Sequence, residues 1–174
     1  EVYTLSGIAK LKGFIKNGFD SSTLINLIVV FDSEKNELSQ RGFTFPPHTF
    51  FYHKVSRSEV IGVLINKHHF IPDEAYQSFN KLVSQLGLQI IERRDSDEIF
   101  ERLVVEANNK VVQKLNNPRF KIGEKDIIIL GGFIREKINF AHSDDEGFLK
   151  TCEELGINTV PTPTLHSQKE KDIK

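Results

Sequence analysis

The chain has 174 residues, of which 39% are hydrophobic and 27% are charged, and its formal net charge is −1. This length and apolar content suffice for one domain with a sizeable core and are too small for two comfortable ones. The near-neutral total charge gives no argument for non-specific nucleic-acid binding, so any basic patch must be local.

The single cysteine, Cys152, excludes an internal disulfide framework and a cysteine-rich zinc site within this chain, and it fits a reducing cytosol. Its place on an apolar helix face predicts a small buried hydrophobe. No apolar run approaches the roughly 20 residues that span a bilayer, and the start lacks the basic-then-apolar order of a signal peptide. We therefore expect a soluble, cytoplasmic protein with no membrane partner.

The first elements are a weak N-terminal segment over residues 1–13 and a strand, interrupted by a turn, over 13–20. Residues 21–31 are almost continuously apolar, which predicts an element packed on both sides with Asp20 at its entrance. Residues 32–42 are polar and predict a loop. The aromatic stretch 43–52 is β-prone, but Pro46 and Pro47 cannot sit inside a central strand, so pairing must fall on one side of them.

Two helices and a strand follow. Ser56 with Glu59 forms a capping box, framed by a Val55–Val60 staple, and predicts a helix over about 57–67. Pro72 opens the next helix, which Gly87 ends, and a short strand covers 88–92. The core face of this second helix is predicted to consist of Ala75, Tyr76, Phe79, Leu82, Val83 and Leu86.

Asp95 with Glu98 begins the longest helix, which stops at the Asn-Asn-Pro-Arg sequence of 116–119. Its predicted core stripe is Ile99, Phe100, Leu103, Val104, Ala107, Val111, Val112 and Leu115.

The last third of the chain reads as helix, strand, helix and strand. Asp126 opens an apolar helix in which Gly131-Gly132 indicates close helix packing and not a phosphate loop. A strand at 138–140 leads to a second capping box, Ser143 with Glu146, and a strand at 157–160 closes the unit. We place the domain at 14–162 and a mobile polar tail at 163–174.

Strands and helices alternate through most of the chain, which favours an α/β fold with a mostly parallel sheet covered on both faces. In such sheets the functional crevice lies at the carboxyl ends of the strands, near a topological switch point. Asp20, Asp126 and Asp145 follow strands or open helices, so they are expected to converge there, with Glu59 as the fourth candidate.

Each of these acids also has a purely structural explanation, because a carboxylate in a first helical turn is favoured by about 0.3–1 kcal/mol. Glu59 completes a capping box, and Asp144 and Asp145 lie inside another, where Glu146 best fits the role of first-turn acid. Their combination favours a site: several close carboxylates repel each other unless a divalent cation neutralises them, and hard oxygen ligands suit Mg²⁺ or Mn²⁺.

Four segments together resemble the PIN domains, VapC-like ribonucleases among them, over about residues 14–162. They are Phe19-Asp20 with the following Ser-Ser-Thr, Ser58-Glu59, Lys125-Asp126 with its apolar run, and Ser143 to Phe148 followed by Gly156 to Pro161. The resemblance implies a three-layer α/β/α sandwich with a parallel sheet of about five strands. The sequence departs from the family pattern at Ser22, where Asn is frequent, and at Gly147, where many members carry another acid.

The same resemblance implies a metal-dependent endoribonuclease with Asp20, Glu59, Asp126 and Asp145 as its acidic set. Asp20, Asp126 and Asp145 would hold Mg²⁺ or Mn²⁺, Glu59 would add to the cluster, and Ser22 and Ser143 would orient the ligands. The implied partners are an RNA substrate, an antitoxin-like or ribosome-associated protein and a second copy of the chain.

Two other functions stay open. A PIN-like module could bind RNA or a protein without cutting, and a phosphoryl-accepting receiver also gathers acids at strand ends, although no Lys follows the last strand here. Two further features are secondary. Neighbours in a helix face different sides, which argues against His68-His69 as a metal pair. The dispersed cations Arg93, Arg94, Lys110, Lys114, Arg119 and Lys121 fit either an RNA-facing patch or a solvated surface.

Overall fold

A computed structural model describes residues 15–29 and 48–162 of the chain. The predictions for the segment 1–13, the loop 32–42 and the tail 163–174 lie outside these residues. None of the helices in the described ranges is long and apolar enough to cross a membrane.

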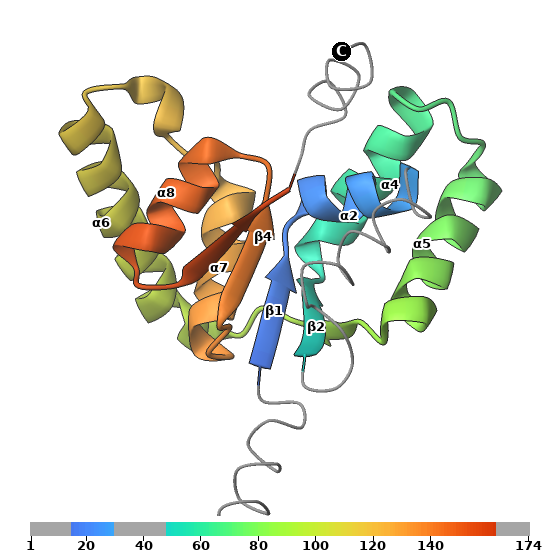
Figure 1. The fold of residues 1–174 in the computed structure, drawn as a ribbon, viewed down its shortest axis with the longest axis horizontal. Coiled ribbons are helices and arrows are strands. Elements are labelled where there is room, and N and C mark those ends of the chain that lie inside the picture. Colours follow the sequence, from blue (N-terminus) through green and yellow to red (C-terminus); the bar gives the residue numbers. More distant parts are fainter. Residues whose placement is uncertain (1–14, 30–47, 163–174) are drawn as a thin grey trace, which may run out of the picture.

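Five parallel strands form the central sheet in the order β3-β2-β1-β4-β5 (Figure 1). The strands are β1 (Ile15–Phe19), β2 (His48–His53), β3 (Gln89–Ile91), β4 (Phe140–Ser143) and β5 (Asn158–Pro161). From β1 the chain first builds outward through β2 and β3, then returns to add β4 and β5 on the other side. The gap between β1 and β4 is therefore the switch point at which parallel α/β sheets bind ligands.

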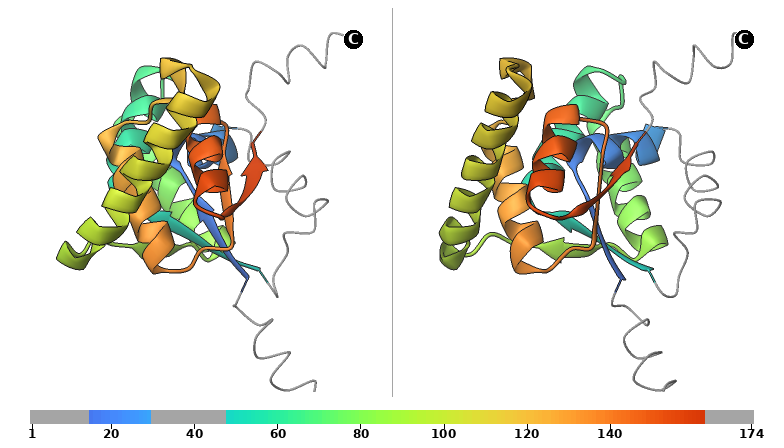
Figure 2. Two further views of the ribbon diagram at one scale, coloured as in Figure 1. Left: turned by 90° about the vertical axis from the view of Figure 1, so that its left-hand side faces the viewer. Right: turned by 60° about the vertical axis from the view of Figure 1, so that its left-hand side comes forward.

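Helices cover both faces of the sheet and make the three-layer α/β/α sandwich that the sequence predicts (Figures 1 and 2). On one face lie α2 (Ser21–Val29), α4 (Val55–Asn66) and α5 (Pro72–Leu86); on the other lie α6 (Glu98–Leu115), α7 (Glu124–Arg135) and α8 (Glu146–Glu154). Two short 3₁₀ helices, η1 (Asp95–Asp97) and η2 (Pro118–Phe120), flank α6. Each face has its own core: Phe19, Leu24 and Phe79 belong to the first, and Phe51, Phe133 and Phe148 to the second.

The strand predictions are correct in number and direction, with shifted bounds. The sequence predicts pairing on one side of the diproline, and β2, which begins at His48, lies on its carboxyl side. β4 and β5 lie later than the predicted 138–140 and 157–160, because their pairing partners on the sheet, and not their apolarity alone, set their register.

Both predicted capping boxes are wrong. α4 begins at Val55 with Lys54 as its N-cap, and the Ser56 hydroxyl is buried without a hydrogen-bond partner. In α8 the N-cap is Asp145, whose carboxylate accepts the N–H of Phe148 at 2.8 Å, while Glu146 is the first helical residue. The Ser-x-x-Glu pattern is local, whereas the course of the preceding strand decides where each helix begins.

The predicted core stripes are only partly buried. On α5, Ala75, Phe79 and Leu82 are buried, but Tyr76 is 46% exposed. On α6 the buried apolar residues are Val104, Ala107 and Val111, whereas Ile99, Leu103 and Leu115 are exposed. These residues lie at the edges of a stripe wider than the surface that each helix packs against.

Helix α7 is fixed to the sheet and to α6 by very close contacts. A Cβ atom on Gly131 would lie 2.8 Å from Glu101 Cγ of α6, and one on Gly132 would lie 2.8 Å from His53 Cδ2, so the glycine pair serves close packing as predicted. Arg135 holds the other end of α7 through a buried ion pair with Asp97, at 3.0 and 2.9 Å. Asp126 is therefore presented from a rigid helix.

Two glycines allow a matched test of this packing. A Cβ atom on Gly18 in β1 would lie 2.5 Å from the Phe133 ring, whereas one on Gly62 in α4 would meet nothing within 4 Å. We expect Gly18→Ala to lower the free energy of unfolding by about 1–3 kcal/mol through overpacking. Gly62→Ala should raise it by roughly 0.5–1 kcal/mol through helix propensity. Urea denaturation checks both values, and a Gly18→Ala variant as stable as the native chain would contradict the packing described.

Candidate active site at the carboxyl edge of the sheet

Asp20 lies at the switch point, directly after β1, and its side chain is 4% exposed. Its backbone N–H donates to the His142 carbonyl at the end of β4. The Asp20 carboxylate accepts three hydrogen bonds: from the Thr23 N–H at 2.9 Å, from the Ser22 hydroxyl at 2.7 Å, and from the Ser143 hydroxyl. Asp20 thus caps the amino end of α2 and joins it to the end of β4.

Burial raises the pKa of Asp20 to about 6, although the hydrogen bonds from Ser143, Thr23 and Ser22 act in the opposite direction. The nearby carboxylate of Asp144 raises the pKa further. The Asp20 side chain is therefore held in one orientation, in a place where its negative charge is costly.

Ser143 connects Asp20 to the start of α8. Its hydroxyl donates to Asp20 and accepts the Asp145 N–H at 3.0 Å. Ser22 makes a parallel link, because its hydroxyl donates to Asp20 and accepts the Asp144 N–H at 3.2 Å. Both predicted orienting residues thus contact Asp20 directly. The exposed Asp145 uses Oδ1 to cap α8.

Glu59 comes to the same edge from α4. Its Oε2 accepts a hydrogen bond from the Ser21 hydroxyl at 3.3 Å, so its carboxylate is directed toward the start of α2 and not toward its own helix terminus. This contact replaces the capping role that the sequence pattern assigned to Glu59.

Asp126 stands in the first turn of α7, and its pKa is raised to about 7. Burial is the largest cause, and the carboxylates of Asp20, Asp145 and Glu59 follow. All three other predicted acids therefore act electrostatically on Asp126. Burial and this repulsion together outweigh the stabilisation that a helix amino terminus gives a carboxylate.

The four carboxylates supply hard oxygen ligands and a concentration of negative charge, which fits the chemistry of Mg²⁺ or Mn²⁺. Nevertheless, no group of three or more His, Cys, Asp or Glu side chains within residues 15–29 and 48–162 is arranged so that it could hold a metal ion. The acids share one neighbourhood without forming a closed coordination shell.

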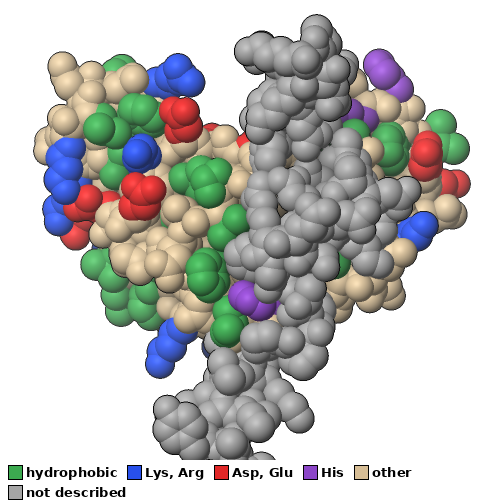
Figure 3. Space-filling view, in the orientation of Figure 1, with side chains coloured by type: hydrophobic (Ala, Val, Ile, Leu, Met, Phe, Trp, Pro, Cys, Tyr) green, Lys and Arg blue, Asp and Glu red, His purple; other side chains and the backbone are tan. Residues whose placement is uncertain are grey.

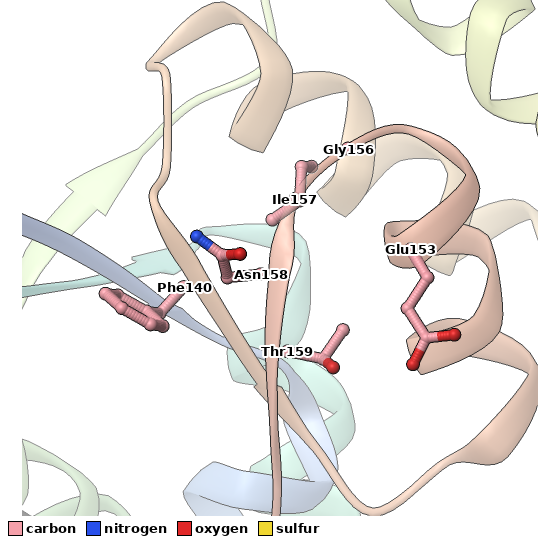
Figure 4. A pocket seen from close by; sticks show the side chains of 6 residues that line it. All are labelled: Phe140, Glu153, Gly156, Ile157, Asn158 and Thr159. Atoms are coloured by element: carbon pink, nitrogen blue, oxygen red, sulfur yellow. The ribbon is translucent and has the colours of Figure 1, made fainter.

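A pocket of about 430 Å³ opens beside these acids. It is lined by Arg119, Phe120, Asp144, Asp145, Glu146 and Gly147. Asp145 is the member of the acid cluster that lines this pocket, so the pocket adjoins the cluster at Asp145. A second pocket, of about 480 Å³, lies along β5 at the edge of the sheet (Figure 4). None of the predicted site residues lines it.

The other sequence candidates do not join the acids. His68 and His69 follow α4, where His69 has a positive φ of 61°, and neither belongs to a group of three or more possible metal ligands within the described ranges. Arg93 pairs with Glu101 at 3.0 Å, and Lys114 pairs with Glu154 at 2.9 Å. Over α6 and α8, basic side chains lie beside acidic ones (Figure 3), which fits a solvated surface better than an RNA-facing patch.

Three contributors were not singled out by the sequence pattern: Ser21, Thr23 and Thr162. Thr23 and Thr162 share a buried hydrogen bond at 2.9 Å, and the Thr162 N–H donates to the Ser143 carbonyl at 2.7 Å. The Ser-Ser-Thr run after Asp20 was an available signal, because small hydroxyl residues after an Asp often satisfy its carboxylate at a helix start. Thr162 had no local signal.

Solved structures share this architecture. One is the structure of VapBC2 from Rickettsia felis bound to a DNA fragment from the VapBC2 promoter. A chain of that structure matches with a TM-score of 0.59 and 14% identity, over 84% of our sequence and 98% of the VapBC2 chain. The protein whose sequence is printed above therefore has a PIN-domain, VapC-like fold. VapBC-1 from nontypeable Haemophilus influenzae matches with a TM-score of 0.57 and 10% identity, over 84% of this chain and 97% of that one.

At the level of sequence, no family model matches and no curated protein is found to be similar. The PIN-domain fold also separates this chain from the receiver hypothesis. Its strand order of β3-β2-β1-β4-β5 differs from the 2-1-3-4-5 order of flavodoxin-like receivers.

The raised pKa of Asp126 predicts a pH-dependent gain in stability on neutralising it. Because the folded pKa of about 7 exceeds the ordinary 3.8, the folded chain binds this proton more tightly than the unfolded chain. Tighter binding of this proton by the folded chain stabilises the fold. This contribution to the free energy of unfolding is complete below about pH 4 and is lost as the pH rises through about 7. Asp126→Asn removes the ionisation and should raise the free energy of unfolding at about pH 8 by on the order of 1–2 kcal/mol.

At about pH 4 the variant and the native chain should differ little, because Asp126 is then protonated in the folded state. Urea denaturation in EDTA at both pH values measures the difference. An equal gain at both would show that the cause is not the repulsion among these carboxylates.

Proposed function

We propose that this protein is a metal-dependent endoribonuclease that hydrolyses RNA phosphodiester bonds through Asp20, Glu59, Asp126 and Asp145. The observation that carries the proposal is the raised pKa of Asp126, to which burial contributes most and the other three carboxylates each add. Such a cluster at a switch point is costly for a folded protein and favourable for binding a divalent cation. The PIN-domain fold is a second support.

In this proposal Asp20, Asp126 and Asp145 hold one or two Mg²⁺ or Mn²⁺ ions directly or through water, and Glu59 adds charge to the cluster. The bound ion would lower the pKa of a water molecule and stabilise charge on the leaving 3′ oxygen. The chain's own contribution is to orient the acids. Ser22 and Ser143 hold the Asp20 carboxylate, and Ser143 also positions the backbone of Asp145.

Protons compete with the cation at this site. Because the pKa of Asp20 is about 6 and that of Asp126 about 7, binding a cation near neutral pH requires these carboxylates to release protons. Activity is therefore expected to rise between about pH 6 and pH 8 as the carboxylates ionise.

We also propose a protein partner of the antitoxin type, because the two structural neighbours are VapBC structures. Ile99 and Leu103, one turn apart on α6, are 66% and 45% exposed and offer apolar contact area to a partner protein or to a second copy of the chain.

A non-cutting RNA- or protein-binding module is the second candidate. Two observations favour it: the Asp20 carboxylate is already engaged by three donors, and no closed metal-binding group is present in the described ranges. In this case the acids would serve only to cap helices and to connect the strand ends.

Cleavage of single-stranded and structured RNA with Mn²⁺ or Mg²⁺ separates the two candidates. The native chain should cleave, EDTA should abolish cleavage, and Asp126→Asn should reduce the rate by roughly 100-fold or more. Asp73→Asn is the matched control, since it makes the same change at an exposed acid in the first turn of α5.

Cleavage that survives in EDTA or that is equal for Asp126→Asn and the native chain would refute the metal-dependent mechanism. A folded native chain that cleaves no RNA in the panel with either ion would overturn the nuclease proposal, and binding of the same RNA without cleavage would support the non-cutting module.

A further inference from the structure

A third pocket, beside α4, has a chemistry opposite to that of the acid cluster. Its volume is about 410 Å³, and it is lined by Lys54, Arg57, Ser58, Ile61, Gly62 and Tyr76. The lining includes two cations, the hydroxyl groups of Ser58 and Tyr76, an aromatic ring and the apolar side chain of Ile61, and no carboxylate. Its size falls within the roughly 300–1,000 Å³ range of small-ligand sites.

The two cations are available to an anion. Arg57 forms none of the carboxylate ion pairs found within the described residues; its guanidinium lies 5.7 Å from the centre of the Tyr76 ring and 5.9 Å from that of Phe79. Stacking on a ring leaves the N–H edge of a guanidinium free to donate. Lys54 pairs with Glu92 at 3.2 Å, but both side chains are more than 60% exposed, so a phosphate can replace this weak pair.

The aromatic and apolar parts of the pocket are open as well. Tyr76 is 46% exposed although its position on α5 predicts a core residue. Gly62 leaves space beside the ring, because a Cβ atom there would meet nothing within 4 Å. A flat ring with an empty volume beside it suits stacking of a planar base.

The pocket lies on the same side of the fold as the acids. Lys54 follows the end of β2, and its N–H donates to the Ile91 carbonyl at the end of β3, so the pocket borders the carboxyl edge of the sheet. Arg57 and Ser58 directly precede Glu59, whose carboxylate turns the other way, toward Ser21. The first turn of α4 therefore separates the acid cluster from the basic pocket.

We propose that this pocket binds one nucleotide of the RNA strand, with its base against Tyr76 and its phosphate against Arg57 and Lys54. The inference rests on the proposed function and adds a binding site for the substrate strand outside the acid cluster. An acidic peptide would use the cations and leave the exposed ring and the space at Gly62 unexplained, so a nucleotide accounts for more of the pocket.

The test is binding of a short, fluorescently labelled oligouridine strand to the native chain in EDTA, followed by anisotropy, with a gel to show that the RNA stays intact. Tyr76→Ala should weaken binding roughly tenfold, and Tyr76→Phe should restore it, because stacking needs the ring and not the hydroxyl group. Gly62→Leu should weaken binding similarly by filling the pocket without changing charge. Arg57→Gln should weaken binding and reduce its dependence on salt.

Arg102→Gln is the control for charge, since Arg102 is an exposed cation on α6 that pairs with Glu98. The proposal is overturned if the native chain does not bind the strand, if Tyr76→Ala and Gly62→Leu bind as well as Arg102→Gln, or if polyglutamate displaces the RNA and itself binds Tyr76→Ala as tightly as the native chain. Because no divalent cation is present, failure of the nuclease mechanism would leave this result unaffected.

Discussion

The rest of the site depends on the hydrogen bonds that satisfy the buried carboxylate of Asp20. A carboxylate at this depth is costly unless several donors satisfy it, and Ser22, Thr23 and Ser143 supply those donors. These bonds fix the start of α2 against the end of β4, and through Ser143 they also place the backbone of Asp145. This connection at the switch point places Asp145 relative to Asp20, while Glu59 and Asp126 come to the same edge from α4 and α7.

Capping and metal binding are compatible uses of the same side chains. On Oδ1, Asp20 and Asp145 each accept a backbone N–H of the helix that follows, and Oδ2 of Asp20 accepts the Ser143 hydroxyl. Because each carboxylate oxygen has more than one lone pair, an oxygen that accepts a hydrogen bond can also contact a cation. Asp126 is the residue that distinguishes the two interpretations. It stands in a first helical turn, where a carboxylate is normally favoured, yet its pKa rises to about 7 because burial and three other acids oppose its charge. Helix capping alone does not account for such a concentration of charge, whereas a divalent cation would offset it.

The sequence predicts the parallel sheet and the meeting of the acids because both follow from order along the chain: the carboxyl ends of parallel strands share one edge. It does not predict which residue begins α4 or α8, since burial of Ser56 and capping by Asp145 depend on how the preceding strands run. The ion pair of Asp97 with Arg135 joins residues far apart in the chain and leaves no local pattern. The sequence does not predict the basic pocket either. Tyr76 has the helical spacing of a core residue, and its 46% exposure is seen only in the structure.

The acid cluster and the basic pocket lie on either side of the first turn of α4, and the two proposals together have one strand of RNA contact both. The central claim, however, concerns the acids alone. Calorimetric titration of the native chain with Mn²⁺ at about pH 7.5 and about pH 5.5 tests it most directly. We predict binding that is weaker at the lower pH, is accompanied by proton release, and is lost in Asp126→Asn but kept in Asp73→Asn. Absence of Mn²⁺ binding, or equal binding by Asp126→Asn, would contradict the claim that these carboxylates form a cation site.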